Sequence, residues 1–281
     1  MKNIVITGTS SGIGRATAER LVKNGYRVFG SVRREKDGEA LRKTLGDQFI
    51  PLVLDVTDSK TIDLAVSLVS SVVKNGCLAG LINNAGIVVQ GPIMHMPVEA
   101  VREMFDINVL GVLRMTQAFL PLLGAVKNRR HAPGRIINIS SMSGKCVHPF
   151  MAAYASSKFA LEALSDGLRR ELLPYGIEVS VIEPGDVDTP IYEKQSLRSP
   201  YAHTDYGLVH QKFLDAVPAA RKNSLPVGSV VDAIIAALTD KKPAVRTMVP
   251  GESLKQKIEH LLLPARHVDR RIAQGTFGGM L

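Results

Sequence analysis

Short apolar runs alternate with longer segments of helical periodicity along most of the chain, and this alternation restricts the fold more than any other feature. The runs are rich in Val and Ile and apolar at successive positions, which is typical of strands buried on both faces of a parallel sheet. They are Asn3–Thr7, Tyr26–Val32, Phe49–Leu54, Leu78–Asn83, Arg135–Ser140, Ile177–Glu183 and Ala244–Val249. The helical segments are a stretch ending near Gly25, then Glu35–Leu45, Ser59–Lys74, Pro97–Leu123 (one long or two short helices), Ala152–Leu173 and Val230–Leu238. This order predicts an α/β fold: a doubly wound parallel sheet of about seven strands, with helices on both faces.

Residues 1–250 contain no internal repeat and no linker, so we expect one domain there. The stretch 188–228 differs from the rest, because its periodicity is weak and it holds Pro190, Pro200, Pro218 and Pro226. A long segment of this kind within a compact domain is usually functional, and we interpret it as a substrate lid. Residues 251–281 are expected to form a helical tail, with an amphipathic helix from Ser253 onward.

The composition argues against several classes of protein. The net charge is +9 over 281 residues, but the charge is spread out, aromatic residues are 5% and Trp is absent, so a base-stacking surface for nucleic acid is not expected. No window approaches ~18 consecutive apolar residues, so no membrane span is expected. Cys77 and Cys146 are the two cysteines, which provide neither a disulfide framework nor a zinc site. With no secretory leader visible, we expect a cytoplasmic protein without a metal.

A glycine-rich turn follows the first strand. It reads Thr-Gly-Thr-Ser-Ser-Gly-Ile-Gly over residues 7–14, with Gly8, Ser10, Ser11, Gly12, Ile13 and Gly14 as candidate phosphate-binding residues. Glycines let the backbone approach a pyrophosphate, and the following helix N-terminus offers free N–H groups. The spacing is not the common G-x-G-x-x-G, and an ordinary loop is an equal alternative for the turn alone. Its place in a βαβ series favours dinucleotide binding.

Tyr154 and Lys158 are four residues apart on an expected helix and therefore share a face. An ammonium ~4 Å from a phenol can bring the phenol pKa down by some three units, which would suit proton exchange near neutral pH. Ser141 ends the fifth strand, at the sheet edge where ligands of doubly wound folds bind. For the tetrad alone, a core tyrosine beside a surface lysine is the commoner case.

Further motifs fall in a fixed order along the chain. Asn83-Asn84-Ala85-Gly86 ends the fourth strand, Asn108 lies on the helix after it, and Pro184-Gly185 follows the sixth strand. Together with the glycine turn, Ser141 and the Tyr154/Lys158 pair, these residues make the chain resemble the classical short-chain dehydrogenase/reductase family over about residues 2–250. A weaker resemblance, in residues 25–29 and 262–266, is to the steroid- and retinol-oxidising branch of that family.

The resemblance implies a Rossmann-like sheet and a catalytic, dinucleotide-binding domain that transfers a hydride between a nicotinamide cofactor and a carbonyl or alcohol. It implies that Tyr154 is the acid/base, that Lys158 lowers its pKa and holds the nicotinamide ribose, that Ser141 polarises the carbonyl, and that Asn108 holds a water in a proton relay. The implied cofactor contacts are, besides the glycine turn, Tyr154 and Lys158, the residues Asp55, Val56, Asn84, Ala85, Gly86, Pro184, Gly185, Val187 and Thr189. Some relatives bind the dinucleotide without turnover, so a redox sensor or scaffold is the alternative.

The end of the second strand bears on the choice of cofactor. Arg33 and Arg34 follow it, and no acidic residue occurs before Glu35. Arginines can hold a 2′-phosphate with paired donors, where a carboxylate would repel it. We therefore expect NADP rather than NAD, with solvent-facing arginines as the alternative.

The substrate is expected to be a small, lipophilic alcohol or carbonyl compound. Met142–Phe150, Gly91–Met96 and the segment after Pro190 should surround it, because they supply methionines and aromatic residues. The residues singled out are Met94, Met96, Met142, Val147, Phe150, Met151, Ile191, Tyr192, Tyr201, Phe213 and Val217. The family resemblance also implies a homodimer or homotetramer.

Overall fold

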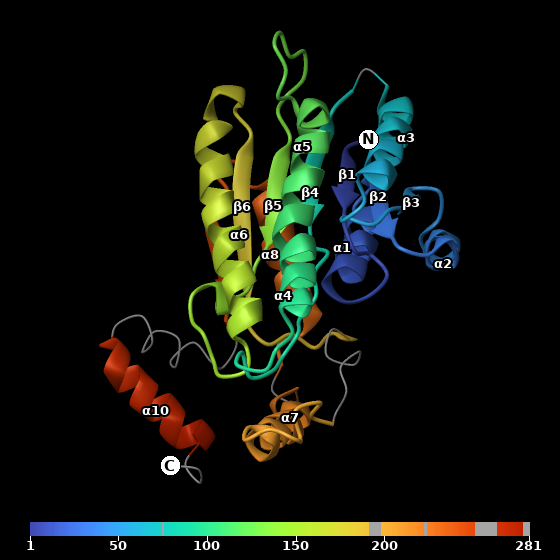
Figure 1. Cartoon of the computed structure of the whole chain (residues 1–281). Helices are drawn as coiled ribbons and strands as arrows, with labels where there is room; N and C mark the ends of the chain where they lie inside the picture. Colours follow the sequence, from blue (N-terminus) through green and yellow to red (C-terminus); the bar gives the residue numbers. More distant parts are fainter. Residues whose placement is uncertain (75, 191–197, 222–223, 251–262, 278–281) are drawn as a thin grey trace.

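The fold is built on a parallel sheet, seen in a computed structural model that describes residues 1–74, 76–190, 198–221, 224–250 and 263–277. Within these residues the sheet has seven strands in the order β3-β2-β1-β4-β5-β6-β7, all parallel (Figure 1). The strands are β1 (Asn3–Ile6), β2 (Arg27–Val32), β3 (Phe49–Val53), β4 (Leu78–Asn83), β5 (Arg135–Ile139), β6 (Glu178–Pro184) and β7 (Arg246–Val249). The expected α/β class is confirmed, and the predicted strand ends differ by a residue or two.

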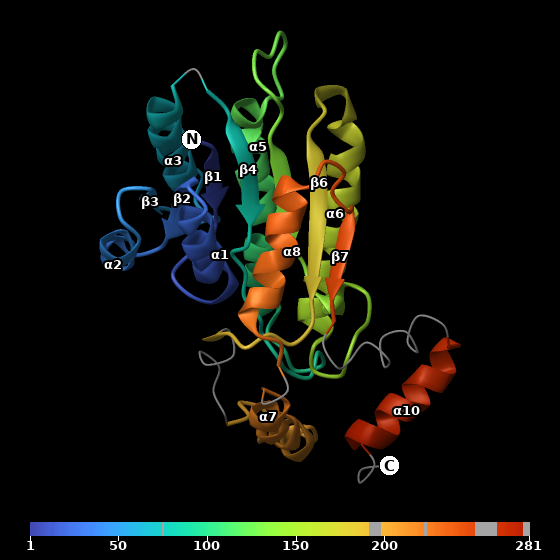
Figure 2. The same cartoon turned by 180° about the vertical axis from the view of Figure 1, so that it is seen from behind.

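Helices cover both faces of this sheet. One face carries α3, α4, α5 and α6, and the other carries α1, α2 and α8 (Figures 1 and 2). Their bounds are α1 (Gly12–Lys23), α2 (Glu35–Leu45), α3 (Ser59–Val73), α4 (Val98–Phe105), α5 (Gly111–Leu123), α6 (Ala152–Glu171) and α8 (Val227–Thr239). Apolar residues on the inner side of each layer are fully buried against the strands, among them Phe119 on α5 and Ile234 on α8. The two cores therefore lie on opposite sides of one sheet.

Local chemistry fixes several helix ends. Asp58 caps α3, where its carboxylate accepts a hydrogen bond from the Lys60 N–H, as short polar side chains do at helix starts. Gly124 ends α5 with φ of +102°, a left-handed conformation that glycine adopts without a steric cost. The loop after it, residues 127–133, projects from the surface (Figure 1).

The segment predicted as one long or two short helices is α4 and α5 joined by a π-helical turn, η1 (Asp106–Leu110). π-turns of this kind are rare in proteins overall, and those that occur are often found at functional sites. Asn108 lies in the turn and is 1% exposed. The extra residue of the turn therefore directs the Asn108 side chain into the interior.

The strand order reverses between β1 and β4. From β1 the chain proceeds outward through β2 and β3, and then returns to β4 on the other side of β1. The loops after β1 and β4 consequently diverge and leave a crevice beyond the carboxyl ends of the strands, the place where doubly wound folds bind ligands.

The predicted lid segment contains a helix that the sequence reading missed. Helix α7 (Gly207–Arg221) lies beyond the carboxyl ends of the strands (Figures 1 and 2). Pro218 lies inside it and weakens the helical signal in the sequence. Helix α10 (Ala265–Phe277) lies beside α7, whereas residues 251–262, where the amphipathic helix was expected to begin, are outside the described residues. No described helix combines the length and apolar character needed to cross a bilayer.

Candidate active site

A cavity of about 990 Å³ occupies the crevice at the carboxyl ends of the strands. Ser141, Tyr154 and Lys158 line it, and so does every predicted cofactor contact except Gly14. These contacts are Gly8, Ser10, Ser11, Gly12, Ile13, Arg33, Arg34, Asp55, Val56, Asn84, Ala85, Gly86, Pro184, Gly185, Val187 and Thr189. Residues far apart in sequence are thus brought to one cavity, in the arrangement that the motifs indicated.

The glycine turn is shaped for close backbone approach. Gly8 and Gly12 have φ of +71° and +59°, a region that side chains with a Cβ rarely enter. A Cβ on Gly14 would lie 2.3 Å from the Gly8 carbonyl oxygen and 2.4 Å from Asn84 Nδ2. Gly14 therefore acts behind the cavity, where it lets α1 pack directly on the turn, and this explains why it does not line the cavity itself.

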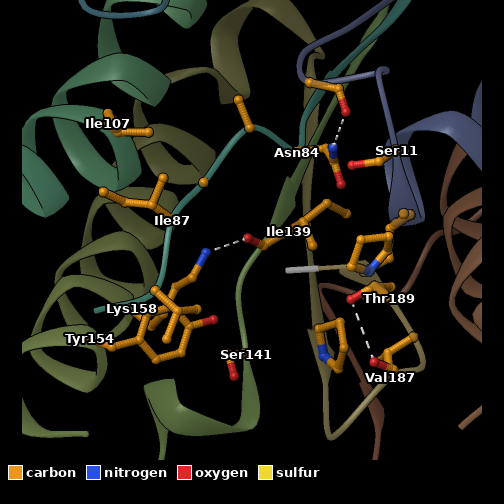
Figure 3. Close-up of a pocket in the computed structure, with 18 of the residues that line it drawn as sticks. Ser11, Asn84, Ile87, Ile107, Ile139, Ser141, Tyr154, Lys158, Val187 and Thr189 are labelled. Atoms are coloured by element: carbon orange, nitrogen blue, oxygen red, sulfur yellow. Dashed lines mark hydrogen bonds between the residues drawn. The ribbon is translucent and has the colours of Figure 1, made fainter. Parts of the chain in front are cut away.

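Thr7 and Asn84 hold the turn against the end of β4. Asn84 Nδ2 donates to the carbonyl oxygens of Thr7 at 2.9 Å and Gly8 at 3.1 Å (Figure 3). In return, Thr7 Oγ1 accepts from the backbone N–H groups of Asn84 and Ala85, each at 2.9 Å. These hydrogen bonds hold the two loops that flank the crevice in a fixed position relative to each other. The glycine turn and the end of β4 together form a cradle, and a cradle of this kind fits a dinucleotide pyrophosphate.

The two arginines after β2 have different surroundings. Arg34 forms a two-point ion pair with Asp37, with Nε–Oδ2 at 2.8 Å and Nη2–Oδ1 at 3.0 Å. Arg33 has no ion pair or hydrogen bond within the described parts of the chain, and its exposed side chain lines the cavity. Arg33 is therefore the arginine whose donors are available to an anion.

Tyr154 and Ser141 bring two hydroxyl groups to one side of the cavity (Figure 3). Removal from bulk water raises the pKa of the Tyr154 phenol to about 12, hydrogen bonding with the Ser141 side chain lowers it, and the charge of Asp186 raises it. Ser141 is positioned in turn because its Oγ accepts the Ser143 N–H at 3.0 Å. The phenol is therefore protonated at neutral pH and can donate to an oxygen in the cavity.

Lys158 is buried one helical turn after Tyr154. Its Nζ donates to the Ile139 carbonyl oxygen at 2.9 Å and lies 5.7 Å from the centre of the Tyr154 ring. Burial lowers the pKa of Lys158 from 10.5 to about 8. The lowering of the phenol pKa by Lys158 stays a prediction, since burial dominates the Tyr154 pKa here.

Asn108 is close to this group but lies behind it. Its Nδ2 donates to the Ile87 carbonyl oxygen at 2.9 Å and to Ser157 Oγ at 3.0 Å, while its Oδ1 accepts the Ile87 N–H at 2.9 Å. The side chain does not line the cavity. These hydrogen bonds connect η1 to α6 and to the loop after β4. The role of Asn108 in holding a water stays a prediction.

Other residues of the site were not singled out from the sequence. Ser31 on β2 accepts the Gly8 N–H on its Oγ at 2.9 Å, and Asp186 lines the cavity and acts on the Tyr154 pKa. Asp186 directly follows Pro184-Gly185, so its place after a strand end was a usable signal. Ser31 had none, because a serine inside a strand looks like any other.

The substrate end of the cavity is lined by part of the expected set. Met142, Met151, Phe213 and Val217 line it, and His148 lies there as well. Phe150 is turned into an aromatic cluster with Tyr206, His210 and Phe213. Met94, Met96, Val147 and Tyr201 are not among the lining residues, and Ile191 and Tyr192 are outside the described residues. Because Phe213 and Val217 come from α7, the lid segment does form a wall of the cavity.

A parallel sheet with a glycine turn at its switch point, and with Tyr, Lys and Ser at the same edge, defines an NAD(P)-dependent oxidoreductase site. Residues 2–199 match the model of the short chain dehydrogenase family, and the chain belongs to that family. It is 41% identical over 271 residues to the NADPH-dependent 3-dehydrocapnine reductase of Ornithobacterium rhinotracheale. The aligned region covers 96% of this chain and 95% of the relative.

Two further comparisons extend the match. The chain is 36% identical over 261 residues to the 17-beta-hydroxysteroid dehydrogenase type 6 of Bos taurus, over 87% of this chain and 79% of the relative. The crystal structure of a short-chain dehydrogenase from Streptomyces avermitilis superposes with a TM-score of 0.78 at 29% identity, over 100% of this chain and 98% of that one. The chain is therefore an enzyme of this family that acts on small molecules.

Proposed function

We propose that the chain reduces a lipophilic ketone to a secondary alcohol with NADPH, within one catalytic domain over residues 1–250. The observation that carries the proposal is the meeting of the Ser141 and Tyr154 hydroxyls with the Lys158 amine in one cavity, whose other end is the glycine turn. A bound nicotinamide would supply the hydride.

Tyr154 is the proposed proton donor. A phenol with a pKa raised to about 12 carries its proton at neutral pH, so it can deliver that proton to a carbonyl oxygen as negative charge develops there. Ser141 is proposed to donate a hydrogen bond to the same oxygen, because its hydroxyl faces the same space. Hydrogen bonds directed at a developing oxyanion lower the barrier to reaction.

Lys158 is proposed to contact the ribose of the cofactor and to place a positive charge beside Tyr154. Its amine is buried at the junction of α6 and β5, so little solvent screens that charge. The remaining proposed cofactor contacts are the cavity-lining residues named above, with Gly14 shaping the turn from behind.

NADP is the proposed cofactor, chiefly because Arg33 is unpaired within the described chain and borders the cavity. A guanidinium suits a phosphate dianion, and the end of β2 offers no carboxylate that would bind ribose hydroxyls in its place. The NADPH dependence named for the relative from Ornithobacterium rhinotracheale supports this choice.

The lipophilic substrate is proposed from the lining of the cavity. Met142, Met151, Phe213 and Val217 are apolar and come from two different segments. Methionine side chains adapt to irregular apolar shapes. The relative from Bos taurus is named as a 17-beta-hydroxysteroid dehydrogenase, and this name supports a steroid-like substrate.

The test is a screen of carbonyl compounds with NADPH, in which turnover is measured as the loss of NADPH absorbance. We expect turnover with long-chain or steroid ketones and little with short polar ketones of equal carbonyl reactivity. Turnover with short polar ketones alone would contradict the lipophilic assignment, and no oxidation of NADPH by any ketone, with NADPH bound, would contradict the reaction.

A further inference from the structure

One carboxylate on the wall of the cavity has no partner in the part of the chain that the structure describes. Among the described residues, the carboxylates that line the cavity are those of Asp37, Asp55 and Asp186. Asp37 pairs with Arg34, and Asp55 Oδ1 accepts the backbone N–H and the hydroxyl of Thr57 at 2.9 and 2.7 Å. The Asp186 carboxylate has neither an ion pair nor a hydrogen bond within the described residues. Its partner is therefore expected to come from a ligand.

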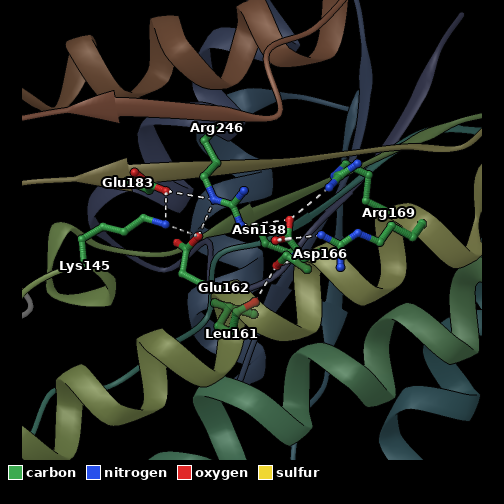
Figure 4. Close-up of polar contacts among 10 residues, drawn as sticks. Asn138, Lys145, Leu161, Glu162, Asp166, Arg169, Glu183 and Arg246 are labelled. Carbon is green, nitrogen blue, oxygen red and sulfur yellow. Dashed lines mark hydrogen bonds and ion pairs between the residues drawn. The ribbon is translucent and has the colours of Figure 1, made fainter.

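The carboxylates behind the cavity are treated differently. Glu183, at the end of β6, is 1% exposed, and its Oε1 lies 3.4 Å from both Lys145 Nζ and Arg246 Nε (Figure 4). Glu162 Oε2 lies 3.2 and 2.8 Å from the same two atoms. The chain thus supplies cations to the carboxylates that it buries. Asp186 is exposed, so water satisfies it until a substrate fills the cavity, and it is then stable only beside a cation or other donors.

Asp186 belongs to the same end of the cavity as the reacting groups. The Ser140 N–H donates to the Ile182 carbonyl oxygen at 2.8 Å, so the segments that lead from β5 to Ser141 and from β6 to Asp186 leave the sheet side by side. In agreement with this placement, the charge of Asp186 acts on the Tyr154 phenol. The other two carboxylates of the cavity follow β2 and β3, on the opposite side of the sheet. Asp186 is therefore the acidic group nearest to the position proposed for the substrate carbonyl.

The backbone at Asp186 is held in place by its neighbours. The Gly185 N–H donates to the Val249 carbonyl oxygen at 2.8 Å, and the Asp186 carbonyl oxygen accepts the Leu225 N–H at 2.9 Å. Ser224, which precedes Leu225, also lines the cavity and brings a hydroxyl to the same part of the wall. A carboxylate on a fixed backbone beside a hydroxyl suits a ligand that donates several hydrogen bonds.

We propose that Asp186 binds a cationic group of the substrate, and that the substrate is a lipophilic ketone with a protonated primary amine near its carbonyl. An ammonium group has three donors for the Asp186 carboxylate and the Ser224 hydroxyl. The charge of Lys158 would otherwise repel such a substrate, so a carboxylate in the wall is needed for the substrate to bind. The inference rests on the proposed function, because it names the substrate class of that same site.

The test compares two long-chain ketones that differ only on the carbon next to the carbonyl, where one carries a primary amine and the other a hydroxyl. The unmodified enzyme should have a kcat/KM about tenfold or more higher for the amino ketone, because a charge-assisted hydrogen bond is stronger than a neutral one. The amine also changes the reactivity of the carbonyl, so the ratio of the two kcat/KM values is compared between enzymes. Asp186→Asn keeps the shape and removes the charge, and it should lower this ratio about tenfold.

Asp188→Asn is the matched control. Asp188 is two residues further along the same segment and is also exposed, but it does not line the cavity, so the ratio should stay the same. Asp186→Glu keeps the charge and should retain most of the preference for the amino ketone. An unchanged ratio in Asp186→Asn, or an equal fall in both Asn variants, would overturn the proposal.

The same variants separate this role from an effect on the cofactor. Asp186 is next to Val187, a proposed cofactor contact, and the oxidised nicotinamide ring is positively charged. If the carboxylate served that ring, Asp186→Asn would weaken the binding of NADP⁺ relative to NADPH and leave the ratio of the two ketones unchanged. Calorimetric titration with the two cofactors measures this difference, and that combination of results would contradict the proposal.

Decylamine, which has no carbonyl to reduce, distinguishes failure of this inference from failure of the proposed reaction. Calorimetry should show that the NADPH complex binds decylamine about tenfold or more tightly than decanol, and that Asp186→Asn removes the difference. If this difference is found but no ketone is reduced, the reaction is wrong and the ammonium site stands. If ketones are reduced but decylamine and decanol bind equally, the reaction stands and the ammonium site is wrong.

Discussion

The Lys158 ammonium donates a 2.9 Å hydrogen bond to the Ile139 carbonyl oxygen, and this contact joins the helix that carries Tyr154 to the strand that leads to Ser141. The proposed acid and its hydrogen-bonding partner are therefore held together by one buried charge. Burial of that charge has a cost in stability, because the lysine loses hydration that a single carbonyl does not replace.

Replacement of Lys158 by Met should stabilise the cofactor-free protein while it removes activity. The pKa falls from 10.5 to about 8 on folding, so below pH 8 the folded state bears the whole cost, about 3 kcal/mol. Between these two pH values the unfolded chain holds a proton that the folded chain lacks, and stability rises with pH there. In the variant the Ile139 carbonyl oxygen loses its hydrogen bond, which destabilises the folded state by about 1–2 kcal/mol. We therefore expect the free energy of unfolding to rise by about 1–2 kcal/mol at pH 7.

Urea unfolding measures this gain, with Lys23→Met on the exposed side of α1 as the control. A clear loss of stability in Lys158→Met would mean that the buried ammonium is better compensated than the structure indicates.

A Cβ at Gly14 should disrupt the cradle. Gly14→Ala would force the glycine turn away from Asn84, because the contacts at 2.3 and 2.4 Å are far inside normal packing. Overpacking of this kind costs about 1–3 kcal/mol, and NADPH affinity should fall with it. Gly167→Ala in α6, where nothing lies within 4 Å, should instead stabilise by about 0.5–1 kcal/mol. Thermal unfolding of both variants checks the contrast, and equal effects would argue against a tightly packed turn.

Arg33 should set the preference for NADPH over NADH. Charge-assisted hydrogen bonds are worth about 1.5–3 kcal/mol, so Arg33→Ala should reduce the ratio of the two kcat/KM values tenfold or more. Arg34→Ala should reduce it less, because Arg34 is held by Asp37. Arg33→Asp should reverse the preference, and added salt should weaken it in the unmodified enzyme. Equal kcat/KM values for the two cofactors before any mutation would refute this assignment.

Assembly into a dimer or tetramer stays a prediction. Leu110 and Phe159, which lie on the layer of α4, α5 and α6, are 45% and 43% exposed. Two copies related by a two-fold axis could cover such a face. Sedimentation should give particles of about two or four times the 30.4 kDa chain, and Phe159→Asp should shift them toward one chain. Single-chain particles at micromolar concentration would exclude this interface.

The sequence was informative where local pattern dominates and silent where burial does. Strands such as β4 could be predicted because every residue before Asn83 is apolar, and the glycine turn because glycine adopts its left-handed geometry without a steric cost. Helix α7 was missed because Pro218 interrupts its pattern. The burial that raises the Tyr154 pKa could not be predicted, because it depends on how deeply the ring is enclosed. The pairing of Glu162 with Lys145 and Arg246 could not be predicted either, because it joins three segments that no spacing rule connects.

The central claim is that Tyr154 donates the proton in carbonyl reduction, and Tyr154→Phe tests it most directly. The variant keeps the ring and loses the hydroxyl, so single-turnover reduction of a ketone by bound NADPH should slow by about 10²–10⁴-fold, with NADPH affinity unchanged. Tyr175→Phe at the surface should leave both quantities as they were. If Tyr154→Phe keeps more than about a tenth of the rate, a margin far outside the expected loss, Tyr154 is not the acid.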